Sequence, residues 1–283
     1  RVMDYFKPTF YLGMTASPDR TDSFNIYELF NNNIVYEVRL KEAMENDLLC
    51  PFHYFGISDL EIDGQPIDEL SDFSKLYSDK RVNHIIDRIN YYGYSGNRVK
   101  GLVFCSSKQE AKALSDEFNK RGFKTTSLTG EDSQEIRERE VERLVADSGD
   151  VLDYIFTVDI FNEGVDIPEV NQVVMLRPTQ SAIVFIQQLG RGLRKSKDKV
   201  FVVIIDFIAN YKNNFLIPVA LSGDNSYDKD TVRKFLSQGT RYLPGTSTIH
   251  FDEISKQRIY SAIDNVKLNT WIFVATEYSK LKN

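Results

Sequence analysis

With 283 residues, of which 42% are hydrophobic and 27% charged, the chain is long enough for one large domain or two modest ones, and its composition argues against disorder. No apolar run reaches the ~18–20 residues of a membrane span, and the two isolated cysteines, Cys50 and Cys105, argue against disulfides or a zinc site and predict a reducing, cytoplasmic location. The net charge of −6 is opposite in sign to a typical nucleic-acid-binding surface, so local residues must carry any such function.

The first 78 residues mix short elements with polar segments. The apolar run at residues 9–14 predicts a buried strand that leads into a polar loop carrying Thr15 and Ser17. The next predicted elements are a strand at 34–38, a helix near 39–45 and a strand at 51–57. Residues 58–78 are polar and acidic and contain a glycine and a proline, which indicates an insertion or linker.

From residue 79 onwards, helix patterns alternate with strand patterns. Apolar residues at helical spacing predict helices, and the apolar runs between them predict strands. The helices are expected near 82–92, 111–122, 136–145 and 181–189, and the strands at 99–105, 123–127, 154–157, 172–176 and 200–206. Asp132 and Glu135 resemble a capping pair for the third helix. This alternation predicts an α/β domain with a parallel sheet flanked by helices.

Residues 224–283 have a different pattern. Two amphipathic helices are predicted, near 230–238 and 252–264, and neither carries recognisable chemistry. We therefore expect a helical C-terminal extension after the α/β domain.

Polar residues follow several of the predicted strands, where ligands of parallel sheets bind. Ser106 comes after the strand at 99–105, Thr129 and Gly130 come after the strand at 123–127, and Thr157 ends the strand at 154–157. Each of these signals is weak alone, because short hydroxyl residues are also common turn formers.

The most informative segment is QQLGRGLR at residues 187–194. Helical offsets of 0, 3, 4 and 7 place Gln187, Gly190, Arg191 and Arg194 on one face. Guanidinium groups bind phosphates in a planar, bidentate way, and a glycine lets an anion approach the backbone, so this face suits a polyphosphate. The alternative is a solvated basic helix end that the helix dipole favours.

A second segment runs from Thr157 to Pro168. It combines a strand end, an acidic loop, Gly164 with its conformational freedom, and Asp166. The alternative is a strand-to-helix connection in which the carboxylates act as caps. The three histidines have no metal-ligand spacing, and we predict no metal ligands in this chain.

The order of these segments resembles the superfamily 2 helicases, in the branch of bacterial DEAD/DEAH-box-like proteins and restriction-enzyme motor subunits. The resemblance covers roughly residues 8–210. Thr15 and Ser17 match the motif that closes the first RecA-like domain and couples the ATP state to the nucleic-acid grip. Residues 103–107 match the strand that opens the core of the second domain.

The remaining motifs imply particular roles through the same resemblance. Residues 187–194 match the motif that supplies the arginine finger, with Arg194 as the finger, Arg191 as its helper and Gln187 as a nucleotide sensor beside Gly190. Gly164 and Asp166 match the nucleotide contacts of the preceding motif. Ser106, Thr129, Gly130 and Thr157 are expected to hold a nucleic-acid strand by its phosphates.

The resemblance also implies a domain organisation. Residues 1–30 are expected to be the tail of the first RecA-like domain, 31–78 a connecting segment or insertion, 79–223 the second RecA-like domain, and 224–283 the extension. No phosphate loop or acidic magnesium motif occurs in the sequence. We therefore expect ATP with Mg²⁺ to bind between this domain and a first motor domain of the same polypeptide, and this chain alone to be inactive.

Glu163 and Gln187 stand where DEAD-box RNA helicases usually carry Arg and His. Both differences favour DNA over RNA as the partner. The expected function is that of the second motor domain of an ATP-dependent DNA helicase or translocase. Two alternatives remain open: a non-catalytic nucleic-acid- or protein-binding module, and the motor subunit of a restriction or repair nuclease complex.

Overall fold

The computed structural model describes residues 5, 9–14, 27–36, 38, 40–62, 65–66, 68, 76–158, 167–178, 190, 193–222, 228–238 and 245–266. The chain divides into two compact units, one made of Arg1–Val38 with Asn269–Asn283 and the other of Arg39–Leu268. None of the helices in the described part has the length and hydropathy that crossing a membrane requires.

The first unit contains one described helix, the short 3-10 helix η1 (Tyr27–Phe30). Gly13 lies against the Phe30 ring, so that a methyl group at this glycine would come within 2.5 Å of the ring. The buried strand predicted at residues 9–14 is wrong, because these residues pair with no described strand and Phe10, Leu12 and Met14 are exposed. The strand predicted at 34–38 is also not formed by residues 34–36 and 38.

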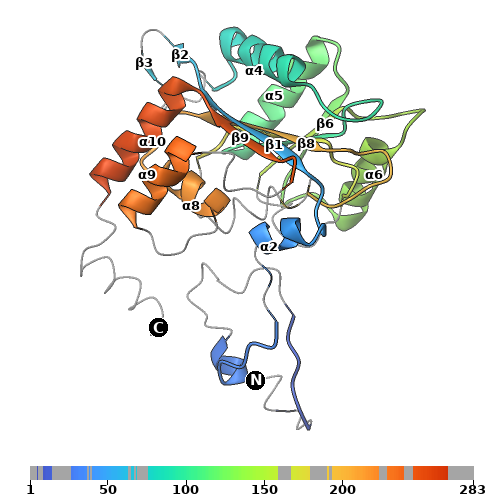
Figure 1. The fold of residues 1–283 in the computed structure, drawn as a ribbon. Helices are drawn as coiled ribbons and strands as arrows, with labels where there is room; N and C mark the ends of the chain where they lie inside the picture. The colour runs from blue at the N-terminus through green and yellow to red at the C-terminus, as the bar shows by residue number, and fades with distance from the viewer. Residues whose placement is uncertain are drawn as a thin grey trace. The chain divides into compact units, whose positions relative to one another are not determined.

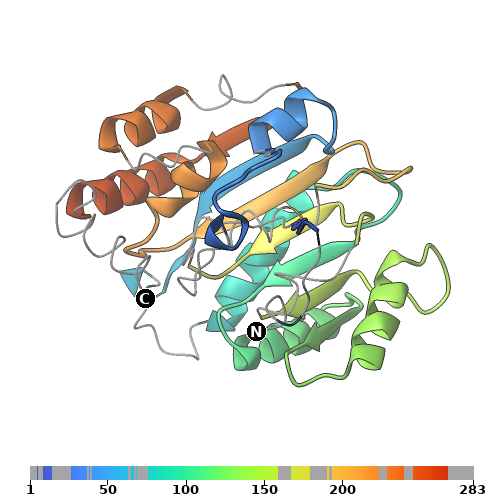
Figure 2. The same ribbon diagram turned by 90° about the horizontal axis from the view of Figure 1, so that it is seen from below.

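The second unit is built on a seven-stranded parallel sheet with the order β5-β6-β4-β7-β8-β1-β9 (Figure 2). The strands are β1 (Phe52–Ser58), β4 (Gly101–Phe104), β5 (Thr125–Leu128), β6 (Tyr154–Thr157), β7 (Gln172–Met175), β8 (Val202–Ile208) and β9 (Thr248–Phe251). The four central strands β4, β6, β7 and β8 are buried at every position. Near-continuous apolar strands are buried on both faces, so the predicted α/β fold with a parallel sheet is confirmed.

Two helices cover one face of this sheet. In α4 (Asp79–Tyr92) and α5 (Lys108–Lys120), the apolar residues recur every three or four positions and form one buried stripe on each helix. Val82, Ile85 and Leu114 on these stripes pack with Val103, Phe156 and other residues of the strands in a single core cluster. Figure 1 shows α4 and α5 together on this side of the sheet.

The other helices are α2 (Leu40–Glu45), α6 (Gln134–Val145), α8 (Leu216–Ser222), α9 (Lys229–Gln238) and α10 (Glu253–Asn265). Figure 1 shows α8 and α9 on the side of the sheet opposite α4 and α5. The predicted helices near 39–45, 82–92, 111–122, 136–145, 230–238 and 252–264 are confirmed, whereas the predicted helix at 181–189 lies outside the described residues.

Three features differ from the sequence analysis. The strand predicted at 51–57 forms, but as β1 it lies inside the main sheet, between β8 and β9. The tail supplies a strand, β9, as well as the two predicted helices, because the alternating burial of Thr248–Phe251 allows it to pair with β1. Within the predicted linker, the described residues include two short strands, β2 (Glu61–Ile62) and β3 (Gln65–Pro66), which pair antiparallel.

The capping residue of α6 also differs from the prediction. Ser133, one position after Asp132, is the N-cap, and its hydroxyl accepts a hydrogen bond from the Ile136 amide. Asp132 accepts hydrogen bonds from the Thr129 amide and hydroxyl, so its carboxylate closes the preceding turn and is not the cap.

Candidate functional site

The parallel register brings the carboxyl ends of four strands to one edge of the sheet. Thr157 at the end of β6 pairs with Leu128 of β5 and with Phe104 of β4, and Phe104 pairs with Met175 of β7. Ser106, Thr129 and Thr157 therefore lie at the ends of three neighbouring strands, as the sequence predicted for the carboxyl edge. Gly130 continues the loop after Thr129.

Ser106 lies between β4 and α5 and is exposed to solvent. Its amide and its hydroxyl both donate to Oε2 of Glu110, over 2.8 and 2.6 Å. The next residue, Ser107, is the N-cap of α5 and accepts a hydrogen bond from the Glu110 amide. The loop and the first turn of α5 thus form a reciprocal capping arrangement that holds Ser106 against a carboxylate.

The Glu110 carboxylate is part of a buried ion cluster. Arg81 of α4 donates from Nη1 to Glu110 Oε1 over 2.8 Å, and from Nη2 to Asp59 Oδ2 over 2.9 Å. All three residues are at most 3% exposed. Burial alone would lower the pKa of the Arg81 guanidinium, but the two carboxylates raise it above its ordinary value. Arg81 therefore stays protonated and joins the end of β1, through Asp59, to the loop after β4.

The loop after β5 is held by one of its own side chains, Asp132, and by one side chain of α6, Arg137. The Thr129 amide donates to Asp132 over 2.7 Å, and the Thr129 hydroxyl donates to the same oxygen over 3.2 Å. Arg137 of α6 donates from Nη2 to the carbonyl oxygens of Thr129 and Gly130. These bonds place a guanidinium group beside the predicted phosphate-binding loop.

Thr157 is fully buried, although it was predicted to contact a strand phosphate. Its Oγ1 has no hydrogen-bond partner, while its carbonyl oxygen accepts from the Cys105 amide over 2.9 Å. A buried hydroxyl without a partner is costly. In this conformation the hydroxyl is not exposed to a phosphate at the surface of the carboxyl edge.

The segment around Arg194 lies elsewhere. Leu193 is buried, and its carbonyl oxygen accepts from the Cys50 amide over 2.6 Å, just before β1 begins. Lys195 forms an ion pair with Asp47. Arg194, which is exposed, is therefore near the amino end of β1, at the edge of the sheet opposite Ser106, Thr129 and Thr157.

Gly190 is the remaining described residue of the predicted polyphosphate-binding face. Its carbonyl oxygen accepts a hydrogen bond from the Leu193 amide, and a Cβ at Gly190 would meet no atom within 4 Å. The space over this backbone is open, as the approach of an anion requires. Gln187, Arg191, Gly164, Asp166, Thr15 and Ser17 lie outside the described residues.

Some residues of the carboxyl edge were not found from the sequence. Arg81, Glu110 and Asp59 lie on three separate elements, and no local pattern indicates that they meet. Arg177 is a clearer omission, because it follows β7 directly, as Ser106 follows β4, and only 7% of it is exposed. A basic residue immediately after a buried strand was a usable signal for this edge.

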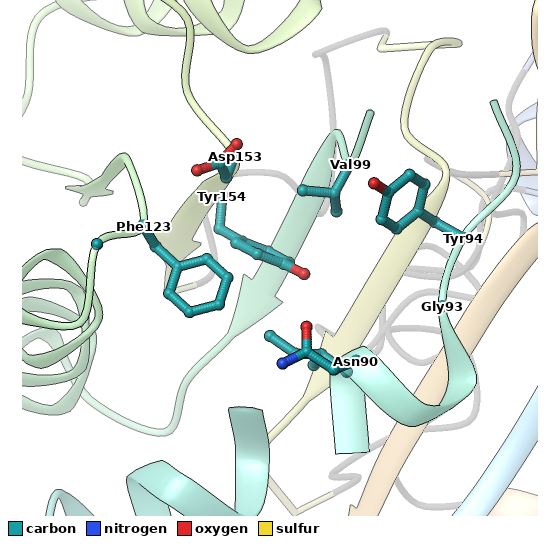
Figure 3. A pocket seen from close by; sticks show the side chains of 9 residues that line it. Asn90, Gly93, Tyr94, Val99, Phe123, Asp153 and Tyr154 are labelled. Atoms are coloured by element: carbon teal, nitrogen blue, oxygen red, sulfur yellow. The ribbon is translucent and has the colours of Figure 1, made fainter. Parts of the chain in front are cut away.

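The described residues also form a pocket of about 330 Å³ at the amino-terminal edge (Figure 3). Asn90, Tyr94 and Phe123 line it, together with the residues at the start of β6. None of the predicted site residues lines this pocket. Within the described residues, no group of three His, Cys, Asp or Glu side chains is arranged to hold a metal ion.

The chain is similar to a helicase domain family and to proteins described as helicases. The family described as the helicase conserved C-terminal domain matches residues 80–196. A Saccharomyces cerevisiae protein described as an ATP-dependent helicase, IRC3, is 26% identical over 220 residues, which are 73% of this chain and 31% of that protein. The pre-mRNA-splicing ATP-dependent RNA helicase PRP28 of Debaryomyces hansenii is 26% identical over 207 residues, which are 72% of this chain and 30% of that protein.

Among solved structures, a fragment from Vibrio vulnificus YJ016, described as an HsdR subunit of a type I restriction enzyme, is similar with a TM-score of 0.57. It is 26% identical, and the match covers 73% of this chain and 41% of that fragment. The chain spans between about a third and about a half of the length of the curated relatives it matches.

Proposed function

We propose that this chain, in which residues 80–196 match the helicase conserved C-terminal domain, acts as the second motor domain of a superfamily 2 ATP-dependent DNA helicase or translocase. In the whole protein it would couple ATP hydrolysis to movement along a strand. We assign residues 1–30 to the tail of the first motor domain, 31–78 to a connection that contributes β1 to the main sheet, 79–223 to the second motor domain and 224–283 to an extension that completes the sheet through β9.

The observation that carries the proposal is the convergence of Ser106, Thr129 and Thr157 on one edge of the RecA-like sheet. Hydroxyl and amide donors suit the oxygens of a phosphate backbone, and such contacts position a strand without reading its sequence. Arg137, which is fixed beside Gly130, adds positive charge at the same edge. A motor that uses these contacts would be independent of sequence.

A second surface would serve the nucleotide. Arg194 is exposed near the amino end of β1, and the backbone at Gly190 is open to an incoming group. When bound, ATP with Mg²⁺ supplies the phosphoryl group whose transfer drives the movement. The Arg194 guanidinium would stabilise negative charge that develops on the γ-phosphoryl oxygens. By the family resemblance, we assign Arg191 and Gln187 to the same function and Gly164 and Asp166 to nucleotide contacts. The magnesium ligands are expected in the first motor domain.

The two surfaces lie at opposite edges of the same sheet. This separation supports a division of labour, in which one edge holds nucleic acid while the other responds to the nucleotide. The sheet and its buried core are rigid enough to transmit a shift between the two edges.

The preference for DNA rests on sequence features. Glu163 and Gln187 differ from the residues usual in DEAD-box RNA helicases, although the relatives include both an RNA helicase and a restriction-enzyme subunit. The similarity to the restriction-enzyme fragment favours a second candidate function, that of the motor subunit of a DNA-cleaving complex. Cleavage of plasmid DNA by the full-length protein, dependent on ATP, would support this second candidate.

The proposed function is tested by measuring steady-state ATP hydrolysis by the full-length protein with no nucleic acid, with duplex DNA, with single-stranded DNA and with RNA. We expect DNA to stimulate turnover more than RNA does. Equal turnover in all four conditions would refute the proposed motor function, and stimulation by RNA alone would refute the DNA assignment.

A further inference from the structure

The two oxygens of Glu110 have different partners. Oε1 accepts a hydrogen bond from Arg81 over 2.8 Å, inside the protein. Oε2 accepts from both the amide and the hydroxyl of Ser106, over 2.8 and 2.6 Å. Glu110 is fully buried, whereas Ser106 is exposed. One carboxylate thus connects a buried cation to a residue at the surface of the carboxyl edge.

This arrangement decides what Ser106 can offer to a ligand. A serine hydroxyl has a single proton, and here that proton lies between Oγ and Glu110. The remaining lone pairs of Oγ are acceptors, and a phosphate oxygen is also an acceptor. The hydroxyl can therefore bind a phosphate only after it leaves Glu110, and the same is true of the Ser106 amide.

The exchange is physically accessible. The bonds from Ser106 to a carboxylate and to a phosphate are both charge-assisted hydrogen bonds of the same class. Arg81 also binds Glu110, so part of the carboxylate charge is already neutralised and its hold on Ser106 is correspondingly weaker. Arg81 also forms an ion pair with Asp59, so its positive charge neutralises the Glu110 carboxylate only in part.

We propose that Glu110 competes with a nucleic-acid phosphate for the hydrogen-bond donors of Ser106, so that this contact forms only when Ser106 turns away from the carboxylate. The inference rests on the proposed function, since it needs a phosphate backbone at the carboxyl edge. Glu110 acts through Ser106 and is a positioning residue that sets how readily the loop after β4 binds phosphate.

The test is a double-mutant cycle on the 283-residue chain, read as the affinity for fluorescein-labelled oligothymidine and for labelled oligouridine at low salt. A neutral amide oxygen holds the hydroxyl more weakly than a carboxylate does, so we expect Glu110→Gln to tighten binding about fivefold. In a Ser106→Ala background, the gain should be clearly smaller, because only the backbone amide at position 106 is then contested.

Glu131→Gln is the matched control. It removes an equal charge from the same edge, where Glu131 is exposed and paired with Lys108. Its effect should be small and equal in both backgrounds. Glu110→Asp is a second variant that leaves a charge for Arg81 but withdraws the carboxylate from Ser106, and it should also tighten binding if Glu110→Gln fails to fold.

The outcomes distinguish a failure of the proposed function from a failure of the competition for Ser106. If the unaltered chain binds neither oligonucleotide at low salt, the proposed function fails. If it binds, but folded Glu110→Gln or Glu110→Asp binds no more tightly than the unaltered chain, the competition is refuted and the proposed function stands. A gain of equal size with and without the Ser106 hydroxyl refutes the competition for that hydroxyl.

Discussion

Tyr54 of β1 donates its phenolic hydrogen to Asp206 of β8 over 2.5 Å, and both side chains are at most 2% exposed. Burial raises the pKa of the Asp206 carboxyl to about 7, although the hydrogen bond from Tyr54 lowers it. The two residues lie on the neighbouring strands β1 and β8, and β1 pairs on its other side with the tail strand β9, so the protonation of Asp206 affects the part of the sheet that the tail completes.

The first prediction concerns the pH dependence of stability. Because the pKa of Asp206 is raised on folding, its stabilising contribution is complete below about pH 4 and is lost as the pH rises through about 7, in total about 4 kcal/mol. Asp206→Asn imitates the protonated state. In urea titrations, the free energy of unfolding of Asp206→Asn minus that of the unaltered chain should therefore increase as the pH rises from about 4 through about 7.

Two further variants make this measurement specific. Tyr54→Phe removes the hydrogen bond that lowers the pKa, so the midpoint of the trend should move to higher pH. Asp230→Asn, at an exposed position of α9, should leave the pH profile unchanged. A stability difference between Asp206→Asn and the unaltered chain that does not vary with pH would contradict the raised pKa.

The second prediction concerns Gly56, where β1 passes between β8 and β9. A Cβ at this position would overlap the Phe251 ring and Ile208. We expect Gly56→Ala to lower the free energy of unfolding by about 1–3 kcal/mol, as overpacking does in other cores. Gly190→Ala is the control, because a Cβ there meets no atom within 4 Å. Equal melting temperatures for both variants would show that β9 does not pack on β1 in this way.

The third prediction tests the arginine finger in the full-length protein. Arg194→Ala should lower ATP turnover by about 10³-fold with little change in nucleotide affinity, because the guanidinium acts on charge that develops in the transition state. Arg194→Lys should not restore turnover, since an ammonium group lacks the planar fork. Lys195→Ala, at the neighbouring exposed position that pairs with Asp47, is the control and should retain turnover.

The fourth prediction concerns the grip on nucleic acid. The 283-residue chain should bind labelled DNA weakly at low salt, and the logarithm of the affinity should fall linearly with the logarithm of the salt concentration. The net charge of −6 limits the strength of binding. Oligonucleotides of different sequence should bind equally, because phosphate contacts carry no sequence information. A strong sequence preference would contradict a grip through the carboxyl edge.

The central part of the fold was predictable because its signals are local. Val82, Ile85 and Ile89 mark the buried side of α4 by their spacing alone, and the apolar run through Val103 marks β4. The same strand ends then place Ser106, Thr129 and Thr157 at one edge, since parallel strands align their carboxyl ends. This much of the candidate site follows from sequence.

The remaining features depend on contacts between distant residues. Nothing near Thr248 indicates that β9 pairs with β1, which lies almost two hundred residues earlier. The meeting of Arg81 with Asp59 and Glu110 has the same origin. The sequence predicted Asp132 as the cap of α6, but its carboxylate closes the turn at Thr129, and Ser133 caps the helix instead. The burial of Thr157 reflects the packing of the whole edge.

The position of β1 in the sheet also constrains the order in which the protein can fold. β1 has no partner until β8 is available, because Phe52 of β1 pairs with Val202 of β8. β9 can then pair only after β1 is in place. During synthesis the residues of β1 therefore leave the ribosome long before their partner strands, and closing such long loops is entropically slow. Until β8 emerges, the apolar β1 is an unpaired strand open to misassociation. Completion of this side of the sheet is thus expected to be a late, post-translational step, and the nascent chain is a natural client for chaperones that bind extended apolar segments.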